Sequence, residues 1–206
     1  MRVLLDSIEE LKNTDISKKV DNRIEEFKKL GTKNSKEIFK ELCFCILTAN
    51  FNAERGISIQ QAIDEGFLNY SEKRLQKELK KLGHRFPNTR AKFISEAQKH
   101  KNNLKKILNK PEQEVREWIA ENVKGLGYKE ASHFLRNIGF QNLAIIDFHI
   151  IDLLVKHGLI EEPKTLTKKK YLEIENLLKK IAEKSGLTLA ELDLYLWFAE
   201  TGKILK

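Results

Sequence analysis

Almost the whole chain carries the hydrophobic period of an α-helix. Residues 18–30 show it well, because Val20, Ile24, Phe27 and Leu30 fall on one stripe with charged residues between them. No segment alternates apolar and polar residues over the length of a half-buried strand. The same reasoning predicts further helices at about 34–49, 54–65, 71–82, 88–100, 112–123, 129–138, 148–157, 168–184 and 189–200. The sequence therefore predicts an all-α protein.

The length and the short connections favour a single folding unit. The 206 residues suit one domain or two small lobes that share a core, and no internal repeat or linker divides them. No apolar run reaches the ~18 residues of a membrane span. The start, MRVLLDSIEELKN, reaches acidic residues too early for a signal peptide. We therefore expect a cytoplasmic protein without a membrane partner.

Charge and cysteine content narrow the classes of function. The chain has 38 Lys and Arg against 30 Asp and Glu, a net charge of +8. Such a surface attracts phosphate polyanions, although lysine-rich solvated surfaces are also common in heat-adapted proteins. Cys43 and Cys45 lie two residues apart, so they point about 200° away from each other on a helix. They are predicted core residues, too few for an iron–sulfur cluster and without the spacing of a zinc site.

A glycine-rich turn between two predicted helices, the hairpin 123–128, is the strongest local motif. Gly125 and Gly127 flank Leu126, so the backbone can turn sharply while the leucine anchors the turn in the core. The same glycines allow backbone N–H groups to approach a phosphate at the positive end of the second helix. Steric need alone explains many such turns. With Lys124 before the turn and a basic chain around it, contact with a DNA backbone is the better interpretation.

Lys129 and Asp147 are the candidate catalytic residues. Lys129 lies in the first turn of the helix after the hairpin, where the helix dipole favours the neutral amine that Schiff-base chemistry needs. A lysine that only contacts phosphate is the alternative. Asp147 follows an apolar run and precedes a helix, which is typical of an N-cap. Because it lies one helix and one turn beyond Lys129, its carboxylate is also placed to take a proton or to stabilise a cation.

Several motifs along the chain together resemble one family. They are LTANF at 47–51, GHRF at 83–86, KGLGYKEASHFLRN at 124–137, DLYLW at 193–197 and TGK at 201–203. A Gly-x-Gly hairpin with a lysine two residues later and an aspartate 18 residues after that lysine is similar to the helix-hairpin-helix DNA glycosylases. Taken together, these motifs resemble most the type-2 8-oxoguanine DNA glycosylase/AP lyases of archaea and some thermophilic bacteria.

The resemblance implies a fold and a reaction. It implies two helical lobes with the lesion pocket between them: a middle lobe at about 51–139 and a second lobe from 1–50 plus 140–206. By similarity, Lys129 attacks C1′ of the damaged nucleotide, displaces the base and forms a Schiff base that allows β-elimination of the 3′ phosphate. Asp147 activates the lysine and stabilises the cationic sugar. The target base must leave the stack to be reached.

The resemblance also implies residues that contact DNA. Arg85 and Phe86 correspond to residues that contact the orphaned cytosine and wedge into the duplex, and an aromatic beside a proline in a short loop suits a wedge. Asn50 corresponds to a polar side chain that probes DNA, and a helix C-cap is the equally favoured alternative. The residue after Asp147 is usually basic in the family, whereas this chain has Phe148.

The resemblance assigns recognition of the damaged base to Trp197 and Lys206. 8-Oxoguanine differs from guanine by an N7–H donor and a C8 carbonyl, so a stacking ring and one placed polar group are enough to discriminate them. On sequence alone Trp197 is an ordinary core residue. His133 lies four residues after Lys129 on the same helical face and is a candidate to orient a phosphate or the flipped nucleotide, with a partly buried histidine as the alternative.

Cofactor and partner expectations follow from the same resemblance. It implies no iron–sulfur cluster, redox cofactor or catalytic metal, although a monovalent cation at the hairpin carbonyls fits the family. The expected partner is double-stranded DNA that contains an oxidised purine, bound by a monomer. Two alternatives stay open: a glycosylase for another damaged base, and a helix-hairpin-helix module that binds DNA without chemistry. Substitution of Lys129 by Gln separates catalysis from binding.

Overall fold

The structure is a computed structural model that describes all 206 residues, and it is entirely helical. Thirteen α-helices and one short 3₁₀ helix are present and no strand, so the predicted all-α fold is confirmed. The helices are α1 (Arg2–Lys12), α2 (Ile16–Thr32), α3 (Ser35–Thr48), α4 (Ala53–Ile63), α5 (Gly66–Asn69), α6 (Glu72–Lys81), α7 (Pro87–Ala97), η1 (Gln98–His100), α8 (Leu104–Leu108), α9 (Glu112–Asn122), α10 (Tyr128–Asn137), α11 (Phe148–Lys156), α12 (Lys168–Ser185) and α13 (Leu189–Thr201).

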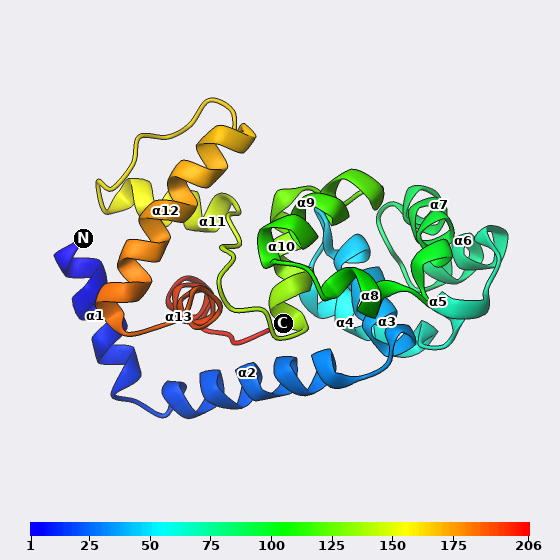
Figure 1. Ribbon diagram of the computed structural model, residues 1–206, viewed down its shortest axis with the longest axis horizontal. Coiled ribbons are helices and arrows are strands. Elements are labelled where there is room, and N and C mark those ends of the chain that lie inside the picture. Colours follow the sequence, from blue (N-terminus) through cyan, green and yellow to red (C-terminus); the bar gives the residue numbers. More distant parts are fainter.

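The helices form two lobes, each with its own hydrophobic core (Figure 1). Helices α3 to α10 surround the larger core, and α1, α11, α12 and α13 surround the smaller one. The predicted boundary between the two lobes at residue 50 is therefore wrong, because α3 belongs to the middle lobe. All residues from Ile38 to Leu47 of α3 except Lys40 are buried, Cys43 and Cys45 among them, so this helix has to lie inside the middle lobe.

Helix α2 joins the two lobes along one edge of the molecule (Figure 1). Its predicted stripe is real, because Val20, Ile24 and Phe27 are buried against α13 in a third hydrophobic cluster. Near its end, Gly31 meets the end of α10 so closely that a Cβ atom would lie 2.1 Å from the carbonyl oxygen of Ile138. Only glycine permits this approach. The helix thus fixes α13 of one lobe against α10 of the other.

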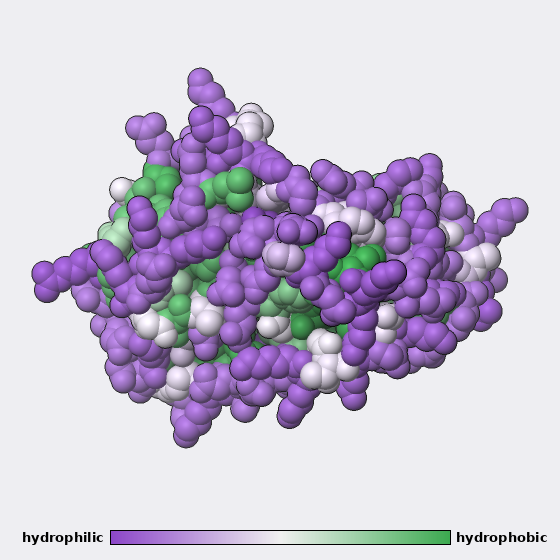
Figure 2. Space-filling model, viewed as in Figure 1, coloured by the Kyte–Doolittle hydropathy of each residue, from purple (hydrophilic) through white to green (hydrophobic).

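Three elements were outside the predicted helices: α1, α5 and α8. The last two have four and five residues, which is shorter than the window in which a helical period can be recognised. Helix α1 buries Leu4 and Ile8 on one face against the smaller core. Every helix is too short or too polar to cross a lipid bilayer. The surface in Figure 2 is mostly hydrophilic, with small hydrophobic patches between the polar side chains.

A buried ion pair connects the two lobes. Arg116 of α9 and Glu175 of α12 have side chains that are 2% exposed, and Nη2 of the arginine donates to Oε1 of the glutamate over 3.1 Å. Glu175 Oε2 also accepts a hydrogen bond from the Ala144 N–H at 2.9 Å, and Arg116 Nη1 donates to the Ser132 hydroxyl. A buried pair of this kind contributes specificity of geometry, and loss of one partner leaves an uncompensated charge.

Substitution of Glu175 by Gln tests this connection. Because Arg116 would stay buried without a counter-charge, we expect the free energy of unfolding to fall by about 3–5 kcal/mol, measured by urea denaturation. The matched control is Glu173→Gln on the same helix, which breaks an exposed pair with Lys170 and should cost about 1 kcal/mol or less. Equal losses in the two variants would show that the buried pair does not hold the lobes.

Candidate active site

The hairpin adopts the predicted turn. Gly125 has a φ of +86°, in the left-handed region that favours glycine, and Leu126 is buried in the larger core. Gly127 has a negative φ, and its N–H donates to Oε2 of Glu130 at 3.1 Å. The N–H groups of Gly125, Tyr128 and Lys129 have no acceptor within the protein. They lie at the positive end of α10, which suits an anion from outside the molecule.

The two candidate catalytic side chains are held in place by different contacts, an ion pair for Lys129 and a helix cap for Asp147. Nζ of Lys129 lies 3.2 Å from Oε1 of Glu130, and the lysine side chain is 31% exposed. Asp147 is the N-cap of α11, where its Oδ1 accepts a hydrogen bond from the Ile150 N–H at 3.0 Å. The predicted cap is thus confirmed. It leaves Oδ2 of Asp147 free of protein hydrogen bonds.

Asp147 follows a segment that α12 holds in place. The hydroxyl of Tyr171 donates to the carbonyl of Ala144 at 2.7 Å and accepts from the N–H of Ile146 at 3.3 Å. Glu175 accepts from the N–H of Ala144 at 2.9 Å. Burial raises the pKa of Tyr171 well above its ordinary value, so the phenol stays protonated and keeps donating. Asp147 is therefore placed by buried hydrogen bonds from a helix that does not carry it.

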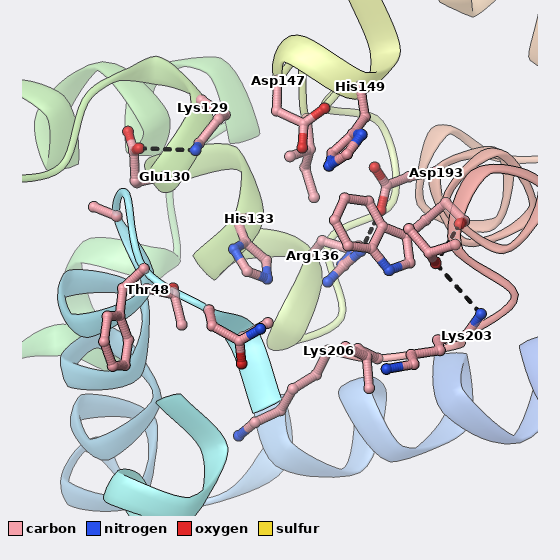
Figure 3. A pocket seen from close by; sticks show the side chains of 18 of the residues that line it. Thr48, Lys129, Glu130, His133, Arg136, Asp147, His149, Asp193, Lys203 and Lys206 are labelled. Carbon is pink, nitrogen blue, oxygen red and sulfur yellow. Dashed lines mark hydrogen bonds and ion pairs between the residues drawn. The ribbon is translucent and has the colours of Figure 1, made fainter. Parts of the chain in front are cut away.

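Lys129 and Asp147 come from different lobes and meet at one cavity of about 570 Å³ (Figure 3). Of the eleven candidate catalytic, base-recognition and DNA-contact residues, this cavity brings together six. They are Asn50, Lys129, His133, Asp147, Trp197 and Lys206. The structure does not bring Arg85, Phe86, Lys124, Gly125 and Gly127 into its lining.

Asn50 is both a terminator of α3 and part of the cavity. Its φ is +56°, a left-handed conformation that asparagine tolerates better than most residues. It follows the C-cap Ala49, and its exposed side chain lies at the cavity. The two interpretations that the sequence left open are therefore compatible.

The loop with Arg85 and Phe86 is fastened to the same edge of the cavity. His84 is buried, its Nε2 donates to the carbonyl of Leu47 at 3.0 Å, and its Nδ1 accepts from the N–H of Phe86 at 3.0 Å. Burial lowers the pKa of His84, in agreement with a neutral ring that makes these two bonds. The ring also stacks on Phe51, which lines the cavity. Phe86 is 37% exposed.

The side chains of Trp197 and Lys206 both line the cavity, but they make different contacts within the protein. The indole of Trp197 meets the ring of His149 edge-on, 5.1 Å between centroids. The ammonium of Lys206 is directed into the protein, where it pairs with Oε2 of Glu41 at 2.8 Å and lies 4.4 Å from the centre of the Phe44 ring. The charge of Lys206 is therefore already used by the buried Glu41.

His133 lies in the lining of the cavity as a partly buried ring. Its pKa lies well below the usual range, chiefly because of burial, and Arg136 and Lys129 lower it further. Its ring packs edge-on against Phe44 at 5.9 Å between centroids. A neutral imidazole contributes no charge to phosphate binding, but its ring nitrogens can donate or accept a hydrogen bond.

Sequence reasoning missed three carboxylates of this site: Glu41, Glu130 and Asp193. Glu41 and Asp193 are acids within long apolar runs of α3 and α13, which is a signal for a buried ion pair. Glu130 lies at the third position of a helix that begins after glycine, where a side chain reaches back to the N-terminal N–H.

Comparisons with known proteins agree with this geometry. A family model described as 8-oxoguanine DNA glycosylase matches residues 20–187. The 8-oxoguanine DNA glycosylase/AP lyase of Methanocaldococcus jannaschii is 53% identical, over 99% of this chain and all of that protein. The chain belongs to this family.

Solved structures of family members have the same fold. The M. jannaschii 8-oxoguanine glycosylase/lyase, crystallised with a 15mer DNA that contains 8-oxoguanine, matches with a TM-score of 0.96 and 51% identity, over 99% of this chain and 100% of that one. The 8-oxoguanine DNA glycosylase of Thermotoga maritima matches with a TM-score of 0.95 and 43% identity, over 100% of this chain and 99% of that one. The two-lobed helix-hairpin-helix glycosylase fold is thus confirmed.

Substitution of Lys206 by Met tests whether the ammonium stabilises the buried Glu41 carboxylate or is free to contact the ligand. Loss of the ammonium leaves the buried Glu41 carboxylate, which is 2% exposed, without its counter-charge. We expect the free energy of unfolding of the DNA-free protein to fall by roughly 3 kcal/mol, measured by urea denaturation. The control Lys203→Met removes an exposed pair with Glu54 and should change it by about 1 kcal/mol or less. An unchanged stability for Lys206→Met would mean that the ammonium is free for the ligand.

Proposed function

We propose that this protein excises 8-oxoguanine from double-stranded DNA and then cleaves the strand at the resulting site by β-elimination. The observation that carries the proposal is the meeting of Lys129 and Asp147, from two lobes, at one cavity of about 570 Å³ in a chain of this family. The place of action is the cytoplasm, on chromosomal DNA.

The nucleophile is the amine of Lys129. It attacks C1′ of the flipped nucleotide, the bond between C1′ and the base breaks, and the base leaves with that electron pair and takes up a proton. Opening of the sugar ring converts the adduct into a Schiff base between Nζ and C1′. Loss of a proton from C2′ then breaks the bond from C3′ to the 3′ phosphate oxygen, which completes β-elimination.

Asp147 supplies the negative charge that this sequence of steps requires. One of its oxygens is committed to the N-cap of α11, so the carboxylate has a fixed direction. The other is available to take the proton of Lys129 and to stabilise the positive charge that develops on the sugar. Glu130, next to Lys129 in the cavity, balances the ammonium before the reaction begins.

The DNA contacts are proposed from the positions around the cavity. The free N–H groups of the hairpin, with Lys124 beside them, bind the backbone of the damaged strand. Phe86 enters the stack that the flipped base has left, and Arg85, whose guanidinium lies 4.9 Å from the centre of the Phe86 ring, contacts the orphaned base. Asn50 faces the DNA beside them.

The proposed steps use a lysine amine and a carboxylate, so we propose that no redox cofactor or catalytic metal takes part. A monovalent cation at the hairpin fits the residues present, because the carbonyl oxygens of Lys124, Gly125 and Leu126 accept no hydrogen bond within the protein. Such an ion would add positive charge for a DNA phosphate.

Borohydride trapping tests the chemistry. The wild-type protein, mixed with a duplex that contains 8-oxoguanine opposite cytosine, should give a covalent complex after reduction, because borohydride reduces the Schiff base. Lys129→Gln should give none. Asp147→Asn keeps an N-cap side chain but removes the charge, so the single-turnover excision rate should fall about 10²- to 10⁴-fold.

Lys124→Gln serves as the matched control for Lys129→Gln. Lys124 lies in the same hairpin, is exposed and pairs only with Glu96. This variant should still be trapped, with weaker and less salt-dependent DNA binding. Trapping on an abasic duplex but not on the 8-oxoguanine duplex would point to another damaged base. Salt-sensitive binding without trapping on either duplex would favour the non-catalytic module.

Phe86→Ala tests the wedge. Without the ring, the gap in the stack stays open and base flipping becomes harder, so excision from an 8-oxoguanine·cytosine duplex should slow by about 10- to 100-fold, or roughly 1.4–2.7 kcal/mol. The loss should shrink on a single-stranded substrate, where nothing has to be unstacked. Val3→Ala removes another exposed hydrophobic side chain, on α1, as the control. Equal losses of Phe86→Ala on both substrates would contradict the role of wedge.

A further inference from the structure

Arg90 of α7 is a buried cation without an acidic partner. It is 7% exposed, and the arginines that form ion pairs are others, namely Arg23, Arg116 and Arg136. Burial lowers the pKa of Arg90, and the carboxylate of Glu130, which lies beyond ion-pair distance, opposes this effect only in part. A buried charge is costly unless it is paired. The guanidinium of Arg90 therefore requires a counter-charge from outside the protein.

The contacts of this guanidinium leave one position open to a ligand. Nη2 donates to the carbonyl of Ala49, directly after α3. Nε is enclosed and has no partner, whereas Nη1 has no partner and is not enclosed. The centres of the Phe86 and Phe93 rings each lie 5.9 Å from Cζ of Arg90. Because these groups surround the rest of the guanidinium, a ligand reaches its charge through Nη1.

Arg90 lies between two segments for which DNA contacts are proposed above. Phe86, on one side, is the proposed wedge. Phe93, on the other side, packs against the hairpin, since a Cβ atom on Gly125 would lie 2.4 Å from Cδ2 of its ring. In the proposed function the wedge enters the duplex at the flipped nucleotide, and the hairpin binds the backbone of the damaged strand. A ligand at Nη1 therefore lies beside the flipped nucleotide, where the DNA offers phosphate groups.

Two more arginines without an ion pair lie at the same loop before α7. Arg55 donates from Nη2 to the carbonyl of Gly83 at 2.9 Å, and Arg85 is exposed two residues further along the loop. Burial lowers the pKa of His84, and the charges of Arg90 and Arg55 lower it further, so both charges act on one place. Three cations that no carboxylate neutralises attract an anion to this loop.

We infer that Arg90 binds a backbone phosphate beside the flipped nucleotide through Nη1. The inference rests on the proposed function, which supplies the places of the wedge and of the hairpin, and it adds a phosphate site that is formed before DNA binds. The carbonyl of Ala49 and the two phenylalanine rings hold the guanidinium in one position, so binding costs little side-chain entropy. A buried guanidinium also attracts a phosphate more strongly than a fully solvated lysine does.

Arg90→Gln tests the charge of this site. Affinity is measured for a duplex that carries a tetrahydrofuran analogue of an abasic site, which cannot form a Schiff base. Loss of one phosphate contact should lower the slope of log affinity against log salt concentration by about 0.9. Lys106→Gln is the matched control and should leave the slope unchanged. It removes an equal charge from an exposed position of α8, beside Lys105, whose N–H donates to Ser35 at the start of α3. An unchanged slope in Arg90→Gln would overturn the inference.

Neutral methylphosphonates identify the phosphate and separate binding from a purely structural role. They replace, one at a time, the phosphates around the analogue in the damaged strand and those around the opposite nucleotide in the other strand. At one position the affinity of the wild-type protein should fall by about 10-fold, and that of Arg90→Gln should fall no further. The strand that holds this position is the one that Arg90 binds. Equal losses in both proteins at every position would overturn the inference and leave Arg90 as a link between α7 and α3.

A crystal structure of the wild-type protein with the same duplex keeps the inference testable if Arg90→Gln does not fold. A phosphate oxygen should lie about 2.7–2.9 Å from Nη1 of Arg90. A nearest phosphate beyond about 4 Å would overturn the inference. Failure of borohydride to trap the wild-type protein on the 8-oxoguanine duplex would instead refute the proposed function, because the affinities measured here do not depend on the chemistry.

Discussion

The buried ion pair between Arg116 and Glu175 is the interaction on which the geometry of the site depends. It joins a helix of the middle lobe to a helix of the second lobe, and Glu175 also holds the N–H of Ala144. From Ala144 the chain runs directly to Asp147. Because Lys129 lies on α10, whose Ser132 contacts the same arginine, one network sets both candidate catalytic side chains relative to each other. Catalysis across two lobes needs such a fixed connection, since small displacements of reacting groups are costly.

A second network of hydrogen bonds and ion pairs lies at the cavity. It connects Asp193 through Arg136 and Asn137 to Glu41, and Glu41 in turn binds Lys206. This network joins α13, α10, α3 and the end of the chain. Each charge in it has a partner, as buried charges require. Two networks of buried polar contacts therefore join the lobes on either side of the cavity: one contains Arg116 and Glu175, and the other contains Arg136 and Asp193.

The sequence could predict what depends on local pattern, and it could not predict what depends on partners distant in the chain. The helical period, the Gly125 turn, the buried Leu126 and the cap at Asp147 are local, and all are confirmed. The place of α3 in the middle lobe required knowing which helices surround it. The inward direction of the Lys206 ammonium depends on Glu41, 165 positions earlier. Periodicity contains no signal for such a pairing.

The distribution of charge separates the attraction of DNA from the chemistry at the cavity. The net charge of +8 attracts DNA over the surface, whereas the charges that line the cavity balance. They are four carboxylates, of Glu54, Glu130, Asp147 and Asp193, and four cationic side chains, of Lys129, Arg136, Lys203 and Lys206. Such a lining holds no excess positive charge for a phosphate, while the N–H groups of the hairpin, which lie outside it, have no acceptor of their own. The backbone is therefore attracted to the hairpin, whereas a neutral base can enter the cavity. Carboxylates at the cavity then favour the positive charge that develops on the sugar, which is the electrostatic condition for cleaving a glycosidic bond inside a DNA-binding surface.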